Sequence, residues 1–259
     1  MFLEFDKFQG TGNDFIVIDN RDGSLLELSP KQIMHITDRR FGIGADGVIL
    51  MNSSKEHDFH MEFYNPDGTK SFCGNGARCA VAFAQRKGFS MGHQCFTAID
   101  GEHSYQIQDS VSVHMKDVEK VTHFEDSRGF AHTGSPHYIL QTNDLTTENV
   151  LKWGRQVRYS EAYAAEGVNV NLAFVKEGNV VEIATYERGV EGETLSCGTG
   201  ATACALYFAD KLGMENGCLN VQTKGGLLQI RFNKSHDGGF DNIWLSGPAE
   251  LVFSGSVEV

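Results

Sequence analysis

Two cysteines, each followed by a glycine-rich turn, are the residues of this chain best suited to acid–base chemistry. The sequence Cys-Gly-Asn-Gly-Ala occupies residues 73–77, and Cys-Gly-Thr-Gly-Ala occupies residues 197–201. Gly10 and Gly134 are separated by the same length of chain as the two cysteines, so the register of an internal repeat extends over much of the two halves. Chemistry on both faces of one carbon atom needs two thiols that approach from opposite sides. A doubled fold with one such cysteine in each half would supply them.

The position of each cysteine, just before a helical stretch, favours proton transfer. A free thiol titrates near pH ~8.5, and little of it is thiolate at neutral pH. At the start of a helix, unpaired backbone N–H groups and the helix dipole favour negative charge and lower the pKa of a thiol. The same N–H groups can bind a carboxylate. Cys73 and Cys197 are therefore the candidate catalytic pair, each with an anion site beside it. The other cysteines are predicted to be packing residues: Cys79, Cys95, Cys204 and Cys218.

The two helices that follow the motifs determine the predicted fold. Residues 77–87 and 201–211 are apolar on nearly every side, and such helices must be buried. Strands are predicted before and after each helix. The sequence thus predicts an α+β fold with two pseudo-symmetric domains from an internal repeat, each a curved β-sheet or barrel wrapped around one central helix.

Shorter patterns place the elements of the first half. Residues 2–20 predict two strands joined by a turn at 10–13, and Ser29 with Pro30 predicts the start of a helix. On that helix Ile33, Met34 and Ile36 are expected to lie on one side, with Gly42 after its end. Further strands are predicted at residues 48–51, 59–63 and 251–257.

No low-complexity linker separates the two halves. The polar stretch 116–129 is the predicted crossing point, which gives an N-terminal half of residues 1–118 and a C-terminal half of residues 119–248. The terminal strand, 249–259, is a candidate to complete the first half, although the pattern alone does not decide this.

Composition excludes several classes of protein and ligand. The net charge of −12, without a basic block, argues against a nucleic-acid partner. No apolar run has the length of a membrane span, and the first residues do not resemble a signal peptide, so we expect no membrane partner and a cytoplasmic location with reduced thiols. The spacings from Cys73 to Cys79 and from Cys197 to Cys204 are wider than those of zinc-ligand pairs, so no metal site is predicted. The sequence leaves the oligomeric state open, a homodimer included.

Six phrases in order along almost the whole chain resemble those of diaminopimelate epimerases. They are Gly10–Phe15 (GTGNDF), Phe41–Gly47 (FGIGADG), Asn65–Gly68 (NPDG), Cys73–Gly76 (CGNG), Tyr186–Gly189 (YERG) and Cys197–Gly200 (CGTG). The resemblance implies an isomerase that needs no cofactor and interconverts LL- and meso-diaminopimelate, on the route to lysine and peptidoglycan precursors. It also implies two domains with the active site in the cleft between them.

The family's catalytic roles can be carried over residue by residue. One motif cysteine removes the α-proton and the other reprotonates the opposite face, which implies these roles for Cys73 and Cys197. His137 matches a histidine that the family places near this pair, and Glu187 joins the catalytic candidates. The resemblance gives no role to a metal or another cofactor.

Specificity for a small-molecule substrate with a second amino-acid end requires further polar contacts. By resemblance, Arg188 binds the distal carboxylate, because its planar fork can meet a carboxylate bidentately, and Glu187 meets an ammonium. Three asparagines supply amide contacts: Asn13, Asn65 and Asn169. Backbone N–H groups from both motifs are expected at the reacting carboxylate: Gly74, Asn75, Gly198 and Thr199. Many members of the family have an amide side chain where this chain has Gly47, and asparagine where it has Ser135, so substrate contacts there are expected to differ.

Two other functions remain open from the sequence. A proline or hydroxyproline racemase-like enzyme would share the fold and the two thiols but would act on a cyclic imino acid without a distal charge, which leaves Arg188 and the asparagines without a use. A thiol redox or binding protein would cycle Cys73 and Cys197 as a disulfide. Substrate tests separate the three functions.

Overall fold

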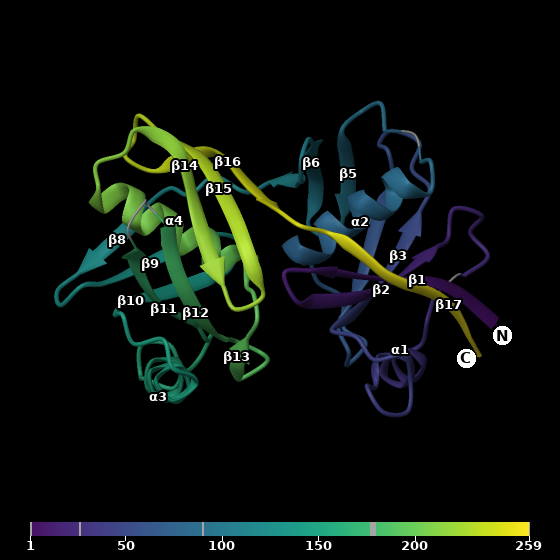
Figure 1. Ribbon diagram of the computed structural model, residues 1–259, viewed down its shortest axis with the longest axis horizontal. Coiled ribbons are helices and arrows are strands. Elements are labelled where there is room, and N and C mark those ends of the chain that lie inside the picture. The colour runs from purple at the N-terminus through teal and green to yellow at the C-terminus, as the bar shows by residue number, and fades with distance from the viewer. Residues whose placement is uncertain (1, 26, 90, 177–179, 259) are drawn as a thin grey trace. The chain divides into compact units, whose positions relative to one another are not determined.

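The computed structural model describes residues 2–25, 27–89, 91–176 and 180–258. Met1 and Val259, the outer ends of the predicted first half, lie outside the described residues. The chain divides into two compact units, one formed by Met1–Val113 with Gly247–Val259 and the other by His114–Ser246. Figure 1 shows the elements of each unit.

The first unit is a sheet with one helix buried against it. Its helices are α1 (Pro30–Thr37) and α2 (Gly74–Arg86), and its strands are β1 (Phe2–Gly10), β2 (Asn13–Asp19), β3 (Gly47–Asn52), β4 (His60–Tyr64), β5 (Cys95–Ala98), β6 (Gly101–Ile107), β7 (Val111–His114) and β17 (Glu250–Glu258). Helix α2 packs on β1, β2, β3, β4 and β17. Apolar side chains from both sides of this contact form one core, with Phe15 and Met61 from the strands and Val81 from the helix.

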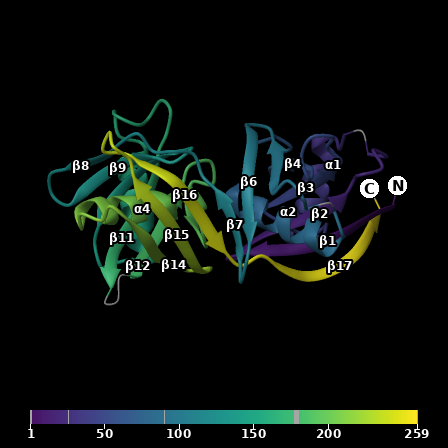
Figure 2. The ribbon, with the colours of Figure 1, turned by 90° about the horizontal axis from the view of Figure 1, so that it is seen from above.

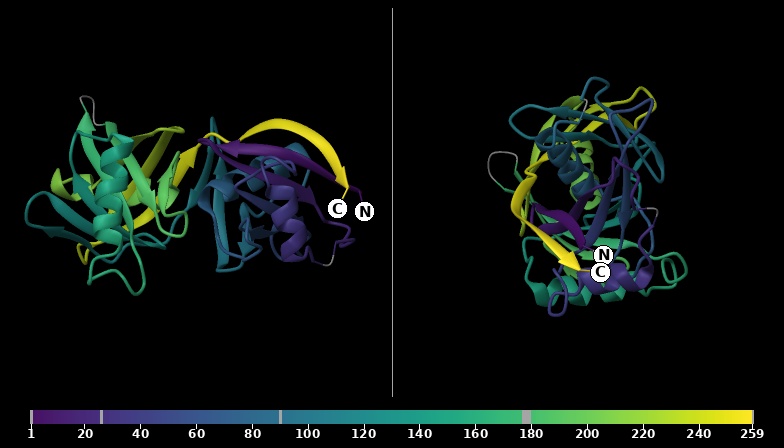
Figure 3. Two further views of the ribbon diagram at one scale, coloured as in Figure 1. Left: turned by 90° about the horizontal axis from the view of Figure 1, so that it is seen from below. Right: turned by 90° about the vertical axis from the view of Figure 1, so that its right-hand side faces the viewer.

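The first two strands form the predicted hairpin. Gly10 pairs with Asn13, so only Thr11 and Gly12 lie in the turn, and both have positive φ, of 52° and 83°. Positive φ at both positions is typical of the two-residue turns whose twist matches that of the strands. The terminal strand β17 pairs antiparallel with β1 from Phe2 onward. The two ends of the chain lie side by side in Figures 1 and 3 for this reason.

Helix α1 begins as the sequence predicts but differs in two details. Ser29 caps it: its side chain accepts from the backbone N–H of Gln32, and its own backbone N–H donates to the side-chain oxygen of Gln32. Pro30 is the first residue of the helix. Ile33 and Ile36 are buried, whereas Met34 is 56% exposed, so the prediction for Met34 was wrong. The helix ends at Thr37 with Asp38 as its cap, several residues before Gly42, because the chain after Asp38 forms a separate turn.

The second unit repeats this plan. Its helices are α3 (Thr147–Arg158) and α4 (Gly198–Lys211), and its strands are β8 (Val121–Phe124), β9 (Arg128–His132), β10 (Pro136–Gln141), β11 (Asn169–Lys176), β12 (Val180–Glu187), β13 (Gly192–Thr194), β14 (Asn216–Thr223), β15 (Gly226–Lys234) and β16 (Phe240–Gly247). Helix α4 packs against seven of these strands and is buried along most of its length. Figure 2 shows strands on more than one side of it. Helix α3 lies outside, on β11, β12 and β13 (teal-green in the left panel of Figure 3).

Strand pairing shows the internal repeat directly. In the first unit β1–β2, β3–β4 and β5–β6 are antiparallel, whereas β2–β3 and β4–β5 are parallel. In the second unit β9–β10, β11–β12 and β14–β15 are antiparallel, whereas β10–β11 and β12–β14 are parallel. A helix occupies the same two crossovers in each unit, since a parallel pair needs a connection long enough to return the chain. The predicted α+β class with two related domains, each a sheet around one buried helix, is confirmed.

The two motif helices begin three residues earlier than the sequence predicts. Helix α2 starts at Gly74 and α4 at Gly198, so the glycine-rich phrases are themselves the first helical turns. Among the described residues, no helix combines the length and the apolar character needed to cross a membrane.

Candidate active site

Cys73 is the N-cap residue of α2. Its backbone is extended, with φ −131° and ψ 115°, and its Sγ accepts a hydrogen bond from the N–H of Gly76 at 3.5 Å. The sulfur thus occupies the position at which a serine or aspartate oxygen usually caps a helix. An N–H donor and the positive end of the helix dipole both favour the thiolate form.

Asn13 lies next to this sulfur with a fixed orientation. Its Nδ2 donates to Oδ2 of Asp46 at 2.6 Å, and a carboxylate can only accept. The amide oxygen of Asn13 therefore faces the other way, where it accepts from Nδ2 of Asn75 at 3.2 Å and lies 3.8 Å from Sγ of Cys73. Three predicted site residues are thereby brought together: Asn13, Cys73 and Asn75.

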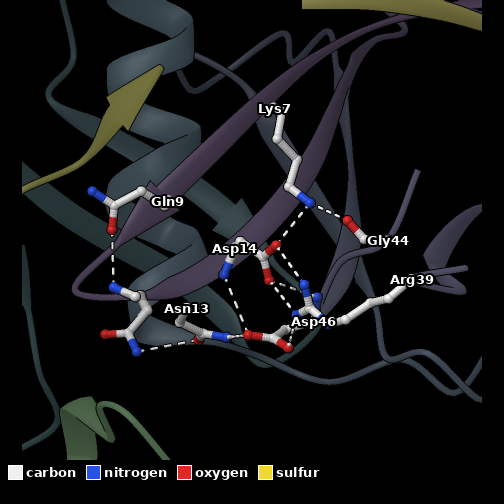
Figure 4. A network of polar contacts seen from close by, with 9 residues as sticks. Lys7, Gln9, Asn13, Asp14, Arg39, Gly44 and Asp46 are labelled. Atoms are coloured by element: carbon white, nitrogen blue, oxygen red, sulfur yellow. Dashed lines mark hydrogen bonds and ion pairs between the residues drawn. The ribbon is translucent and has the colours of Figure 1, made fainter. Parts of the chain in front are cut away.

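A network of charged groups positions Asp46 behind Asn13 (Figure 4). Arg39 lies 2.7 Å from both Asp14 and Asp46, and Lys7 lies 2.7 Å from Asp14 and donates to the carbonyl of Gly44. Burial opposes ionisation of Asp14, but hydrogen bonds from Arg39 and Lys7 outweigh it and lower the pKa of this carboxyl to about 2. Asp14 is therefore charged at neutral pH and anchors β2 to the loop before β3.

Asn65, by contrast, has a local structural role. Its Nδ2 donates to the carbonyl and hydroxyl oxygens of Thr69, at 3.2 and 3.0 Å, and to Ser71 at 3.1 Å. These bonds close the turn after β4. Its predicted contact with substrate stays a prediction.

Helix α2 also carries a fully buried guanidinium one turn beyond its first residue. Arg78 is 0% exposed, and its Nε and Nη1 have no hydrogen-bond partner among the residues that the structure describes. Its Nη2 lies 3.4 Å from the hydroxyl oxygen of Thr11. Burial lowers the pKa of Arg78, whereas the charges of Cys79 and Cys73 act in the opposite direction.

Cys197 is the N-cap residue of α4, in the same backbone conformation as Cys73. It is 7% exposed, and its Sγ lies 3.5 Å from Oγ1 of Thr199. His137 lies behind Thr199, with Nε2 at 2.9 Å from the same hydroxyl oxygen. Burial lowers the pKa of His137 to about 3, helped by the charges of His132 and Arg188, so the ring is neutral at physiological pH.

Asn169, Ser135 and Arg188 form a second cluster in this unit. Asn169 donates to Oγ of Ser135 at 2.9 Å and accepts from the backbone N–H of Arg188 at 2.9 Å. The guanidinium of Arg188 donates to the carbonyl of Glu166 at 2.9 Å and approaches Ser135 at 3.4 Å. Ser135, one of the two departures from the family pattern, therefore links Asn169 to the Arg188 side chain.

Glu187, at the end of β12, accepts from Thr194 Oγ1 at 2.8 Å. The structure thus gives this carboxylate a partner on β13. Its predicted part in catalysis and in ammonium binding stays a prediction.

The other departure, Gly47, has a packing cause. A Cβ at this position would lie 2.2 Å from the Phe63 ring, which fills the space that a longer side chain would need. The chain therefore has no side-chain contact to offer there.

Sequence reasoning missed several polar residues that hold the site. Asp46 orients Asn13, and Asn171 with Thr185 supports His137. Asn171 had a readable signal, since it lies two residues after Asn169 and so on the same face of β11.

One group of potential metal ligands occurs among the described residues. Atoms of His57, Cys95 and Glu102 lie within 4.8 Å of one another, and His57 is already 2.7 Å from Glu102. Neither motif cysteine belongs to this group.

Comparison with known proteins places the chain in a family. The family model described as diaminopimelate epimerase matches residues 5–121 and 129–252. A diaminopimelate epimerase of Flavobacterium psychrophilum is 46% identical, covering 98% of this chain and 100% of the relative. That of Chlorobaculum tepidum is 38% identical, covering 96% and 98%.

The chain belongs to the diaminopimelate epimerase family.

Solved structures of more distant proteins share the fold of this family. A phenazine biosynthesis protein of Bacillus anthracis superimposes with a TM-score of 0.74 at 13% identity, with complete coverage of both chains. A probable proline racemase from Agrobacterium radiobacter has a TM-score of 0.68 at 13% identity, covering 99% of this chain and 92% of its own. At this identity the likeness concerns the fold alone.

Proposed function

We propose that this chain interconverts LL- and meso-diaminopimelate by proton transfer between Cys73 and Cys197. The observation that carries the proposal is the family match over nearly the whole chain, together with a cysteine at the N-cap of each of the two buried helices. Each unit then supplies one thiol to the same α-carbon.

The reaction balances with two thiols alone. The thiolate takes the α-proton, and the electron pair stays on the carbon and its carboxylate. The thiol on the opposite face gives its proton to that carbon, so the two sulfurs exchange protonation states in each turnover. No oxidant, metal or other cofactor enters the sequence of steps.

The difficult part is the negative charge that develops on a carboxylate already charged. Backbone N–H groups at the starts of α2 and α4 are suited to it, since preorganised donors stabilise such charge most. We assign this role to four residues: Gly74, Asn75, Gly198 and Thr199. His137 and Glu187 complete the proposed catalytic set.

The distal amino-acid end needs groups of both signs. Arg188, exposed at the end of β12, is proposed to meet the distal carboxylate, with Glu187 at the ammonium. Three amides are proposed to complete the contacts: Asn13, Asn65 and Asn169.

The test is proton NMR of the reduced protein with LL-diaminopimelate in heavy water, with L-proline in a parallel tube. We expect loss of the α-proton signal and growth of the meso isomer with the first substrate only. Exchange with proline alone would replace this function by that of a proline racemase, whose fold is similar.

A redox function is tested with the same protein. All six cysteines are free thiols. If Cys73 and Cys197 form a disulfide, a reductant should restore isomerase activity. Turnover of an electron donor through the pair, without isomerisation, would instead establish a redox protein.

We further propose that the enzyme works in the cytoplasm, where free thiols stay reduced. Sedimentation velocity tests whether the chain of 28.5 kDa forms a homodimer.

A further inference from the structure

A chain of buried polar groups leads from the sheet of the second unit to the sulfur of Cys197. It begins at Thr185 on β12 and passes through Asn171 on β11 and His137 on β10. It ends at Thr199, in the first turn of α4. Asn171 and His137 are both 0% exposed, so no water competes for their hydrogen bonds.

The orientation of the Asn171 amide is decided by a backbone carbonyl. Its Nδ2 lies 3.0 Å from the carbonyl oxygen of Tyr138 and 3.1 Å from Nδ1 of His137. A carbonyl oxygen can only accept, so the atom that faces it must be the amino nitrogen. That nitrogen has two hydrogens, one for each neighbour. The amide oxygen, on the other side, accepts from Oγ1 of Thr185 at 2.9 Å.

This orientation determines which nitrogen of His137 carries the proton. An amino group donates and cannot accept, so Nδ1 of His137 must offer its lone pair to Asn171. The neutral ring is then protonated at Nε2, which donates to Oγ1 of Thr199 at 2.9 Å. The low pKa of this buried ring agrees with the neutral form.

The last step concerns the hydroxyl of Thr199. Its oxygen lies 2.9 Å from Nε2 of His137, from which it accepts, and 3.5 Å from Sγ of Cys197. Its own hydrogen is therefore available for the sulfur. The backbone of Thr199 is held as well, because its carbonyl accepts from Oγ1 of Thr133 at 2.8 Å. The donor is therefore fixed in place before any substrate arrives.

We propose that Asn171 is a positioning residue that fixes His137 as the Nε2–H tautomer and so directs the Thr199 hydroxyl at Cys197, stabilising its thiolate. The inference rests on the proposed function only in that Cys197 exchanges a proton with substrate. In this arrangement His137 orients the Thr199 hydroxyl and keeps its own proton throughout turnover.

The first test reads the tautomer in the wild-type protein. Protein labelled with ¹⁵N-histidine is studied by long-range ¹H–¹⁵N correlation, and the ring of His137, one of ten histidines, is assigned by its absence in His137→Gln. We expect a protonated Nε2 and an unprotonated Nδ1. A proton on Nδ1, or on both nitrogens at neutral pH, would overturn the inference without any substitution in the chain.

The second test uses Asn171→Asp to reverse the direction of the hydrogen bonds that lead to Thr199. A carboxylate only accepts, so the proton should move to Nδ1 and Nε2 should accept from Thr199. Cys197 then loses the Thr199 donor, and the pH midpoint of its alkylation by iodoacetamide should rise by about 1 unit, the low end of such effects. Peptide mass spectrometry separates Cys197 from Cys73, whose midpoint should not change.

Two further variants keep this test decisive. Thr199→Val should raise the Cys197 midpoint while His137 stays protonated at Nε2. Thr202→Val is the control on the same helix, because its hydroxyl donates to the carbonyl of Gly198, and it should change neither readout. Cys204, a titratable group that interacts with Cys197, is present in every variant.

The readouts separate this inference from the proposed function. Equal midpoints for Cys197 in wild type, Asn171→Asp and Thr199→Val would contradict it even in a fully active epimerase. The expected tautomer in a protein that does not epimerise diaminopimelate would support the proposed hydrogen bonds from Asn171 to Cys197 and would reject the proposed function.

Discussion

At the scale of single residues, environment rather than residue type separates the two proposed catalytic cysteines from the cysteines inside the helices. Cys73 and Cys197 cap helices and have polar hydrogen-bonding neighbours. Cys79 and Cys204 lie inside the same helices, fully buried, and burial raises the pKa of the Cys79 thiol to about 12. The sequence correctly predicted that Cys79 and Cys204 pack inside the two helices, but the same prediction for Cys218 was wrong, because that side chain is exposed on β14. The catalytic role of Cys73 and Cys197 stays a prediction.

Removal of either motif thiol should stop the reaction. We expect Cys73→Ala and Cys197→Ala each to lose at least about a hundredfold in epimerisation rate, the lower end of what a general acid or base contributes, with an unchanged circular dichroism spectrum. Cys79→Ala is the matched control. It should stay active, with a loss in free energy of unfolding of roughly 1 kcal/mol for a small core truncation. Near-wild-type turnover in either motif variant would end the two-thiol account.

His137 should make stability depend on acid pH. Burial holds the pKa of this ring at about 3, below its ordinary 6.5, so the unfolded chain binds a proton between these values and the folded chain does not. Stability from this group is complete above pH 6.5 and is lost as the pH falls toward 3, by up to about 1.4 kcal/mol for each pH unit. Denaturant unfolding between pH 7 and 4.5 should show a flatter dependence for His137→Gln than for wild type. Equal slopes would contradict the buried neutral ring.

At the scale of elements, helices α2 and α4 begin with the same pattern of residues, but different side chains surround their first turns. The third residue of each helix is glycine, Gly76 in α2 and Gly200 in α4. A Cβ on Gly200 would lie 2.6 Å from Oδ1 of Asn171 and 3.4 Å from the sulfur of Cys197. A Cβ on Gly76 would lie 3.3 Å from the ends of two flexible side chains, Ile49 and Met61, and at an ordinary van der Waals distance of 3.5 Å from the Cβ of Cys73.

The corresponding alanine variants should therefore differ. Gly200→Ala should displace Asn171, lose most epimerase activity and cost about 1–3 kcal/mol of stability, as overpacking does. Gly76→Ala should be milder in both respects, because its neighbours can move. Activity assays and thermal unfolding of the two proteins, side by side, test this. Equal effects would show that helix geometry, and not the groups around Asn171, determines the cost.

The charged network around Asp14 should stabilise the fold because the Lys7 side chain in it is buried. Asp14→Asn leaves Lys7, only 7% exposed, with an uncompensated charge, so we expect a loss of about 3 kcal/mol in the free energy of unfolding. Asp19→Asn, at the exposed end of the same strand beside Arg21, should cost less than about 1 kcal/mol. Because the pKa of Asp14 is lowered to about 2, its contribution is complete above pH 4 and is lost as the pH falls through 2. Similar costs for both variants would contradict this assignment.

Local elements could largely be predicted from the sequence, because short-range physical signals specify them. Glycine at positive φ marked the first hairpin, and Ser29 with Pro30 marked the start of α1. Met34 could not be assigned correctly, since a helix of two turns leaves the apolar side ambiguous until its neighbours are known.

At the scale of the molecule, the repeated cysteine–glycine motif correctly predicted two related domains. The repeat is visible in the structure as the same order of parallel and antiparallel strand pairs in both domains. The contacts that support the site could not be predicted, although the position of Asn171 on the same face of β11 as Asn169 could have been. Asp46 and Asn171 act through contacts with residues far away in sequence, and only the folded chain brings these together. The role of the closing strand was also undecided, because pattern alone does not say which edge of a sheet a terminal strand joins.

The measurement that tests the central claim most directly follows deuterium in the first turnovers with LL-diaminopimelate in heavy water. With two thiols, one removes the substrate proton and the other delivers a deuteron from solvent. Mass spectrometry of the separated isomers should then find deuterium in the meso product while the remaining LL substrate keeps its protium. Protium carried from substrate into product would mean that a single base serves both faces, and would contradict the pairing of Cys73 with Cys197.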